Sequence, residues 1–528
     1  MIFLCFPWCK LIQQSNFKFT GDYIHIGIQI QSAFQTLRGF TLDIVEKLAI
    51  LEGERSSINP GPEVRENWDA LVQNLINDAI SKKESGPAYR VAPDNKPIIE
   101  DDFAIHKTGR DMETAMNHLS EKVVSYGVQI GHPNYLAYIP GSDNYLSALG
   151  DYLGAAINPY TGVAITNPGA AAMQQALIKW VGAFLGYKGS FAGDITSGGS
   201  HANLTAIVTA RDFLKIQPED IRQTTVYYSE HAHHSVNKAL HIAGMEYCKQ
   251  RLIACNPDFS ISVDELKKTV QKDKKAGLKP WLIVANAGTT DTGTVDDLNA
   301  MADIAKQYAC WFHVDGAYGA GFALCALGKE ELRGIERADS IVFDPHKSLF
   351  LSFGCGVVLI KNGAALRRAH HFIGNYMRDP GVDTTDSPSS NSAELTRPFR
   401  ALRMWLPLTV LGTDPFRAAL EEKMLLARYA HEKLNKIDHL WVGPLPQLSI
   451  VVFRYQSEDA EHDEKINQDF IEEIIADGEF YISTTELNGK ATLRLAILTT
   501  RTNREAIDNF ILMIEKKVKS LSTEVKST

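Results

Sequence analysis

Residues 310–321, CWFHVDGAYGAG, and residues 338–350, ADSIVFDPHKSLF, carry the clearest structural signal in this sequence. In both, a short apolar run that suits a buried strand is followed at once by small and polar residues, as where a strand leads into a loop. A helical pattern at 296–308 precedes the first run, and its two leading aspartates suit the positive end of a helix dipole. Strand and helix therefore alternate here, which predicts a parallel sheet covered by helices.

The same alternation extends outward over roughly residues 170–360 and predicts an α/β fold, with a mostly parallel sheet flanked by helices. The further elements expected in this region are a helix at 177–185 and strands at 224–228, 281–285, 340–343 and 356–360. After Arg400 the pattern changes to that of a smaller α+β domain. Its expected elements are helices at 413–435 and 503–518 and strands at 448–454 and 492–497.

Four parts are expected along the chain. They are a possible extension at 1–40, an N-terminal helical arm and segment at 41–143, a large domain at 144–409 and a small C-terminal domain at 410–528. The arm has helical periodicity, but it is too small to bury its apolar faces alone, so we expect it to pack on a second copy of the chain. Residues 83–102 suit a linker, and the Ser/Thr/Asp-rich stretch 381–393 suits a mobile loop.

The composition limits the classes of function. Apolar residues make up 45% of the 528 residues and charged residues 22%, as in an ordinary globular protein. The net charge of −9 and the lack of a Lys/Arg block argue against a nucleic-acid partner. The lack of a run of 18 apolar residues predicts no membrane span. Seven scattered cysteines without a C-x-x-C pair, Cys5 and Cys9 among them, predict free thiols in the reducing cytoplasm.

Three groups fall where strands end, which is where ligands gather in open α/β sheets. Asp315 ends one predicted strand, Lys347 follows another, and the loop TSGGSH at 196–201 precedes a helix expected to begin near Ala202. Each feature alone is common, because aspartates cap helices, lysines face solvent and Gly/Ser loops form turns. Together, a carboxylate, an amine and a loop that presents N–H groups to an anion are what pyridoxal phosphate requires.

The segment around Lys347 closely resembles the lysine motif of the group II pyridoxal-phosphate decarboxylases, which act on aromatic amino acids, histidine, glutamate or diaminobutyrate. The likeness runs from about Gly131 to Asn503 with the motifs in one order. The other matching segments are HPNYLAYIPG (132–141), TSGGSHANL (196–204), YSEHAHHSV (228–236), HVDGAYGAG (313–321), FRALRMW (399–405) and LRLAILTTRTN (493–503). The resemblance implies a fold-type I enzyme, similar to aspartate aminotransferase, whose large domain (144–409) binds the cofactor.

The resemblance also implies residue roles. Lys347 forms a Schiff base with pyridoxal 5'-phosphate, Asp315 pairs with its pyridine nitrogen, and His233 stacks on its ring. The further cofactor contacts that it implies are Gly199, Ser200, Asn203, Thr290, Ala317, Asp344 and His346. Tyr138 and Ile139 are expected to line the substrate pocket.

The implied reaction is the decarboxylation of an L-amino acid to an amine and carbon dioxide, through a Lys347 Schiff base and a quinonoid intermediate, in a homodimer with sites at its interface. An aldehyde-forming oxidative deaminase or another carbon–carbon lyase is an alternative on the same fold, and a non-catalytic cofactor-binding protein is a third. The aromatic amino acid members carry a mobile-loop tyrosine that is tied to reprotonation, whereas residues 379–398 contain no tyrosine and Tyr376 lies upstream. The proton donor therefore stays open between His233, a partner-chain residue and another loop.

Two more departures leave the substrate open: Ser348 stands where many members have a bulky residue, and NPGAAAMQQ (167–175) replaces an acidic stretch of the aromatic members. The histidines at 231, 233 and 234 superficially suggest a metal site. No metal is expected, because no matching Cys, His or Glu spacing is found near them.

Overall fold

The computed structural model describes residues 44–92, 98–139, 141, 144–372, 374, 387–457 and 460–524. The chain divides into two compact units: one runs to Asn77 and includes Lys107–His118, and the other comprises Asp78–His106 and Leu119–Thr528. The extension expected at 1–40, with Cys5 and Cys9, lies outside the described residues.

The first unit is helical, as the periodicity of the arm predicts. It contains α3 (Ile44–Glu54), the first part of α4 (Pro62–Ser85) and most of α5 (Met112–Leu119). None of these three helices has a buried residue, and α3 exposes large apolar side chains such as Leu48 and Leu51. The unit therefore has little hydrophobic core of its own among its described residues.

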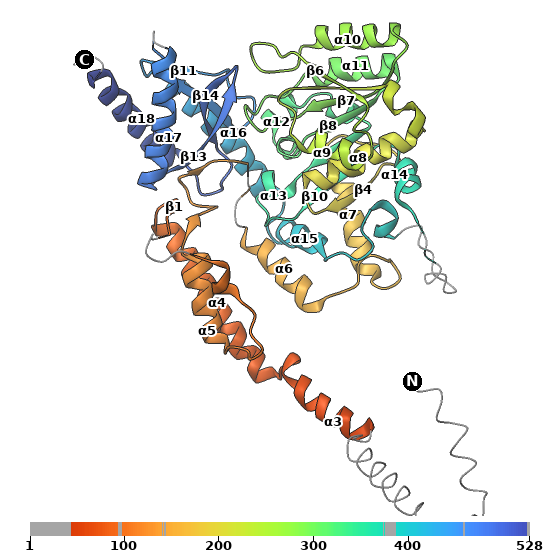
Figure 1. The fold of residues 1–528 in the computed structure, drawn as a ribbon, viewed down its shortest axis with the longest axis vertical. Helices are drawn as coiled ribbons and strands as arrows, with labels where there is room; N and C mark the ends of the chain where they lie inside the picture. The colour runs from red at the N-terminus through yellow and green to blue at the C-terminus, as the bar shows by residue number, and fades with distance from the viewer. Residues whose placement is uncertain are drawn as a thin grey trace, which may run out of the picture. The chain divides into compact units, whose positions relative to one another are not determined.

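The second unit is built on a seven-stranded sheet with the order β4-β10-β9-β8-β7-β5-β6 (Figure 1). Its strands are β4 (Ala192–Thr196), β5 (Thr224–Ser229), β6 (Lys249–Ile253), β7 (Lys279–Asn286), β8 (Trp311–Asp315), β9 (Ser340–Phe343) and β10 (Gly356–Ile360). Neighbours from β6 to β9 are parallel, whereas β10 runs antiparallel to β9 and β4. The predicted α/β class and its five expected strands are confirmed.

Helices cover both faces of this sheet, so its strands are buried on both sides. On β7, Leu282 and Val284 join the core beneath α8 (Gly199–Phe213) and α9 (Ser235–Ile242). The alternating residues Ile283 and Ala285 join the core on the opposite face. The helices that pack there are α7 (Pro168–Phe184), α10 (Val263–Lys275) and α11 (Leu298–Tyr308). Successive side chains of β7 point to opposite faces of the sheet, so each one packs into the hydrophobic core on its own side.

A five-stranded sheet forms the C-terminal part, in the order β11-β12-β14-β13-β3. The strands are β11 (Leu440–Val442), β12 (Ile450–Tyr455), β13 (Tyr481–Leu487), β14 (Lys490–Ala496) and β3 (Tyr135–Leu136). The helices α16 (Asp414–Leu434), α17 (Ala460–Asp477) and α18 (Arg504–Glu524) pack on it. Strand β3 lies far upstream in the chain yet pairs in parallel with β13, so the segment before residue 143 contributes to this sheet.

Several sequence predictions need correction. The TSGGSH stretch is only partly a loop, because α8 already begins at Gly199. Residues 83–102 are not a plain linker, since α4 runs to Ser85 and β1 (Tyr89–Arg90) pairs with β2 (Gly127–Val128).

In the stretch 381–393, the described residues 387–393 are also more ordered than the composition suggests. Its second half holds the 3-10 helix η8 (Pro388–Asn391), and Ser387 is buried with its Oγ accepting a hydrogen bond from the Ala164 N–H. The prediction of a mobile loop is therefore wrong for this half. Residues 381–386 and Tyr376 lie outside the described residues. Within the described ranges, no helix combines the length and the hydropathy needed to cross a bilayer.

Candidate active site

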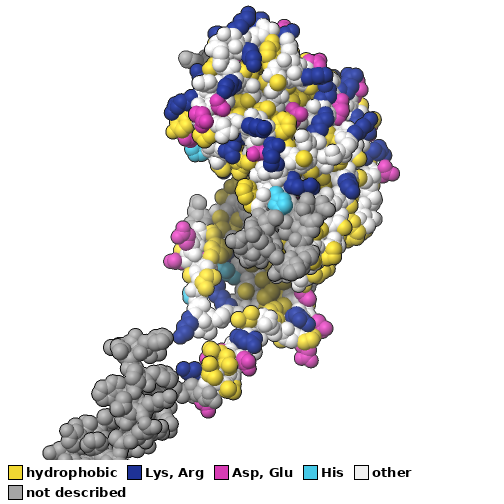
Figure 2. Space-filling view, turned by 90° about the vertical axis from the view of Figure 1, so that its right-hand side faces the viewer, with side chains coloured by type: hydrophobic (Ala, Val, Ile, Leu, Met, Phe, Trp, Pro, Cys, Tyr) yellow, Lys and Arg dark blue, Asp and Glu magenta, His cyan; other side chains and the backbone are white. Residues whose placement is uncertain are grey.

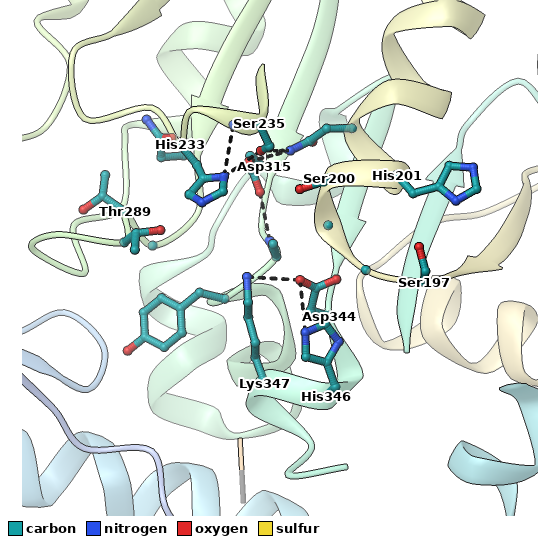
Figure 3. A pocket seen from close by; sticks show the side chains of 18 residues that line it. Ser197, Ser200, His201, His233, Ser235, Thr289, Asp315, Asp344, His346 and Lys347 are labelled. Atoms are coloured by element: carbon teal, nitrogen blue, oxygen red, sulfur yellow. Dashed lines mark hydrogen bonds and ion pairs between the residues drawn. The ribbon is translucent and has the colours of Figure 1, made fainter. Parts of the chain in front are cut away.

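A cavity of about 280 Å³ lies where the large sheet meets the start of α8 (Figure 3). Asn286, Asp315 and Asp344 reach it from the carboxyl ends of β7, β8 and β9, which are neighbours in the sheet. All ten predicted cofactor residues line it: Gly199, Ser200, Asn203, His233, Thr290, Asp315, Ala317, Asp344, His346 and Lys347. The parallel strands explain this convergence, because they deliver their carboxyl ends to one edge.

Lys347 is placed by a single helical turn, α13 (Pro345–Ser348), directly after β9. Pro345 begins the turn, where its lack of an N–H costs nothing. The Lys347 Nζ lies 3.0 Å from Asp344 Oδ2, and Asp344 is almost fully buried. Within the described part of the chain, Asp344 Oδ1 is buried without a hydrogen-bond partner. The amine is thus held at the cavity wall by one carboxylate oxygen.

His346 lies beside this pair. Its Nδ1 is 2.6 Å from the carbonyl oxygen of Cys355, which can only accept, so Nδ1 carries a proton. Burial lowers the pKa of His346, which favours the neutral ring with an unprotonated Nε2. The 3.8 Å approach of Nε2 to Asp344 is then no ion pair, and Lys347 is the cation that balances Asp344.

Asp315 is held by a buried chain of hydrogen bonds. Trp311 Nε1 donates to Ser340 Oγ at 2.8 Å, and Ser340 Oγ lies 2.7 Å from His313 Nδ1. His313 Nε2 lies 2.8 Å from Asn203 Oδ1, and Asn203 Nδ2 donates to Asp315 Oδ2 at 2.9 Å. Burial lowers the pKa of His313 to about 4, so the ring is neutral at pH 7.

The direction of every donor in this chain can be assigned. Asn203 donates its N–H to Asp315, so its Oδ1 accepts from His313 Nε2, and the neutral ring therefore accepts at Nδ1 from the Ser340 hydroxyl. His313 then donates from Nε2 to Asn203 Oδ1, and the Asn203 amide points its N–H at Asp315. The Ala317 N–H donates to the other oxygen, Asp315 Oδ1, at 3.1 Å. Two donors fix Asp315 as an acceptor, which suits a carboxylate that pairs with a protonated ring nitrogen.

His233 is joined to the same network. Asn203 Nδ2 also donates to Ser235 Oγ at 2.9 Å, and the Ser235 hydroxyl lies 2.7 Å from His233 Nδ1. The Ser235 N–H donates to that same nitrogen at 3.2 Å. Because Nδ1 accepts, the neutral His233 carries its proton on Nε2, and burial lowers the pKa of the ring. Ser235 thereby fixes the tautomer of the histidine predicted to stack on the cofactor.

The start of α8 forms the anion cradle. Its N-cap, Gly198, has a φ of 152° and no side chain to satisfy the first N–H groups, which a phosphate can bind. A Cβ on Gly199 would lie 2.9 Å from Asp344 Oδ2, and one on Gly356 would lie 2.6 Å from Gly198 Cα. The backbone can approach this closely only with glycine. Amine, carboxylate and cradle thus share one cavity, and the residues present fit pyridoxal phosphate.

The remaining lining residues were not predicted. They are Ser197, Gly198, His201, Ser235, Asn286, Gly288, Thr289 and Tyr318. Four of them, Gly198, His201, Thr289 and Tyr318, are direct neighbours of predicted residues. Asn286 could have been found because it ends β7 in the same way that Asp315 ends β8.

The two residues expected to line the substrate pocket are not among the cavity residues. Tyr138 is half-exposed, has a φ of 51°, and places its hydroxyl 3.4 Å from that of Tyr481. Ile139 is buried in the hydrophobic core. The prediction that they meet the substrate stays a prediction.

Fold and site together define a pyridoxal-phosphate enzyme of fold type I. The model of the pyridoxal-dependent decarboxylase conserved domain matches residues 95–456. Aromatic-L-amino-acid decarboxylase of Bacillus atrophaeus is 36% identical over 459 residues, which cover 86% of this chain and 94% of the relative. The chain therefore belongs to the pyridoxal-dependent decarboxylase family, so it is a carboxy-lyase whose cofactor is pyridoxal 5'-phosphate.

Two further likenesses are informative. Phenylacetaldehyde synthase of Petunia hybrida is 27% identical over 453 residues, which cover 81% of this chain and 87% of the relative. The crystal structure of Oryza sativa TDC with PLP and tryptamine has a TM-score of 0.83 at 22% identity, covering 88% of this chain and 99% of that chain. The second likeness confirms the predicted fold.

Proposed function

We propose that the enzyme decarboxylates an aromatic or apolar L-amino acid to its amine, with Lys347, Asp315 and His233 as its catalytic residues. The observation that carries the proposal is the set of donors around Asp315, which keeps an acceptor carboxylate in the same cavity as the Lys347 amine. When bound, pyridoxal phosphate supplies an electron sink for the bond that breaks at the substrate Cα.

Each residue has a defined task. The Lys347 amine would hold the cofactor aldehyde, Asp315 its ring nitrogen, and the start of α8 its phosphate. His233, whose Nδ1 accepts from Ser235, holds a proton at Nε2 and can donate it toward the substrate. We assign the proton that returns to Cα to His233, because this ring lines the cavity and holds its proton at Nε2.

The charges at the cavity support the substrate class. Among the described residues that line it, Lys347 is the only Lys or Arg, and it faces Asp344. A second carboxylate on the substrate would need a cation of its own, since an unpaired charge is costly in a site shielded from water. Tyr138, which we expect to meet the substrate side chain, is aromatic and packs on Tyr481 with ring centroids 6.1 Å apart. The relative in Bacillus atrophaeus also bears the name of an aromatic amino acid decarboxylase.

A substrate screen tests this function. The holoenzyme is offered phenylalanine, tyrosine, tryptophan, histidine, glutamate and 2,4-diaminobutyrate, and carbon dioxide, amine, aldehyde and hydrogen peroxide are measured. We expect amine and carbon dioxide in equal amounts, with an aromatic substrate preferred and no peroxide. Aldehyde with peroxide would instead establish the oxidative deaminase, the alternative that the likeness to phenylacetaldehyde synthase brings into view. Preference for glutamate would refute the substrate class.

We also propose that the working enzyme is a homodimer in which the N-terminal arm packs on a second copy. Helix α3 presents Ile44, Leu48 and Leu51 at spacings of four and three, and all three are exposed. In the second unit, Leu153 and Ile157 are exposed on α6 (Tyr145–Ile157), and Val410 and Leu411 are exposed on α15 (Arg400–Leu411), the helix that packs on α6. Figure 2 likewise shows hydrophobic side chains at the surface among charged ones. Apolar faces of this kind suit an isologous interface.

Leu48→Asp combined with Leu51→Asp should convert the dimer to a monomer in sedimentation velocity, because two charges would have to be buried in the interface. Lys47→Glu, a charge change on the same helix, serves as the control and should leave the dimer intact. A wild-type protein that sediments as a fully active monomer would refute the homodimer.

A further inference from the structure

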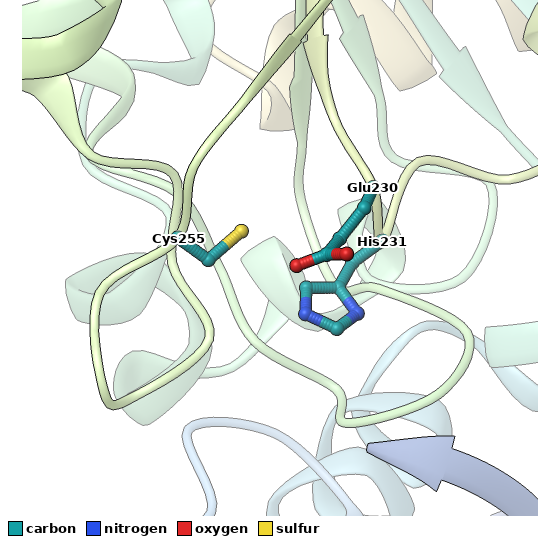
Figure 4. Close-up of side chains that lie close together, drawn as sticks. All are labelled: Glu230, His231 and Cys255. Carbon is teal, nitrogen blue, oxygen red and sulfur yellow. The ribbon is translucent and has the colours of Figure 1, made fainter. Parts of the chain in front are cut away.

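Glu230, His231 and Cys255 form a cluster outside the residues that line the cavity (Figure 4). One potential ligand atom from each, a carboxylate oxygen, an imidazole nitrogen and the thiol sulfur, lies within 4.8 Å of the others. Glu230 and His231 follow β5 directly, and Cys255 follows β6, the parallel neighbour of β5. The sheet therefore brings together three groups that no local sequence pattern connects.

The imidazole of His231 is already oriented as a metal ligand would be. Its Nδ1 lies 2.6 Å from Asp291 Oδ2, and its ring packs edge-on against Phe259 at a centroid distance of 5.6 Å. A carboxylate on one ring nitrogen fixes the ring and leaves Nε2 for a metal, which is the usual arrangement behind metal-bound histidines. Asp291 is itself held, because its other oxygen accepts the Thr292 N–H at 2.8 Å.

We propose that Cys255, His231 and Glu230 bind a thiophilic divalent cation of the zinc class. A thiolate, an imidazole and a carboxylate are all common zinc ligands, and the thiolate disfavours Mg²⁺ and Ca²⁺, which prefer oxygen. Three protein ligands leave a fourth position for water or an exogenous group. Glu230 is exposed and Cys255 half-buried, so an ion can reach the cluster.

The site would act on the loops that line the cavity. His231 is two residues from His233, and Asp291 follows Thr290, whose carbonyl oxygen accepts a hydrogen bond from Arg494. A bound ion would tie the loop after β5 to the start of the loop after β6, and it would hold Asp291 through His231. The inferred role is to stiffen the loops that present His233 and Thr290 to the cofactor.

Cobalt titration of the holoenzyme tests the site independently of activity. After dialysis against a chelator, Co²⁺ is added and the thiolate-to-cobalt charge-transfer absorbance is recorded; Zn²⁺ is then used to displace it. We expect one equivalent per chain with this absorbance, its loss in Cys255→Ser, and binding weakened about 10- to 100-fold in Asp291→Asn. Glu230→Gln, a change at an exposed residue, should weaken binding without affecting folding.

Matched controls are Cys310→Ser, another of the seven cysteines, and His241→Ala, a histidine that pairs with Glu246 instead. Both should bind cobalt like the wild type. If the wild type binds no cobalt, or if Cys255→Ser keeps the charge-transfer absorbance, the proposal is refuted. Neither result bears on decarboxylation, because the readout is the metal spectrum alone.

Discussion

Lys347→Ala should abolish decarboxylation, with a loss of more than about 10³-fold in kcat, because no other amine among the described residues lines the cavity. Without the Lys347 amine, the cofactor can be held only by the N–H groups of α8 and by Asp315. The substrate amine can then no longer take the place of Lys347 on the cofactor. The variant should still fold, since Lys347 is at the cavity wall and not in the hydrophobic core.

Borohydride reduction gives the direct measurement. In the wild type it should fix the cofactor to the peptide that contains Lys347, as seen by mass spectrometry, and the visible absorbance of the attached cofactor should be missing from Lys347→Ala. Lys361→Ala, a lysine at the end of β10 that donates to the Glu336 carbonyl, is the control and should behave as the wild type. Attachment at another lysine would overturn the assignment of Lys347.

Asp315→Asn is expected to have the second-largest effect. The substitution keeps the shape of the side chain but removes the charge that would pair with the ring nitrogen. An opposite charge next to a titrating group typically shifts its pKa by ~1–3 units, so the protonated fraction of the cofactor, and with it kcat, should fall about 10- to 1000-fold at neutral pH. KM should change much less, because Asp315 is proposed to act on the cofactor and not on the substrate.

The loss should be smaller at low pH, where the ring nitrogen gains a proton without help from Asp315. Comparing kcat of the variant and the wild type across pH therefore separates an electrostatic role from a structural one. Asp303→Asn, which removes an exposed carboxylate paired with Arg337, is the control. If Asp315→Asn kept full kcat at neutral pH, the pairing of Asp315 with the ring nitrogen would be refuted.

Most of the fold could be predicted from the chain itself. The buried strands β7, β8 and β9 are nearly continuous apolar runs, as strands covered on both faces must be, so their positions were predictable to within two residues. Their parallel order places Asp315 and Lys347 at one edge, whereas the full set of ten cavity residues was named from the resemblance to the decarboxylase family. The pairing of β3 with β13 was not predictable, because a two-residue strand has no periodicity and its partner lies far along the chain.

The sequence by itself determined which chemical groups are present and where strands end, since backbone propensity and apolar patterning are local properties. Only the tertiary structure decided how those groups are set. The tautomers of His313 and His233 follow from Trp311, Ser340, Asn203 and Ser235, which come from separate elements. Likewise, Cys255 meets His231 only because β5 and β6 are neighbours in the sheet. Hydrogen-bond direction and ligand geometry depend on distances across elements, which no linear pattern encodes.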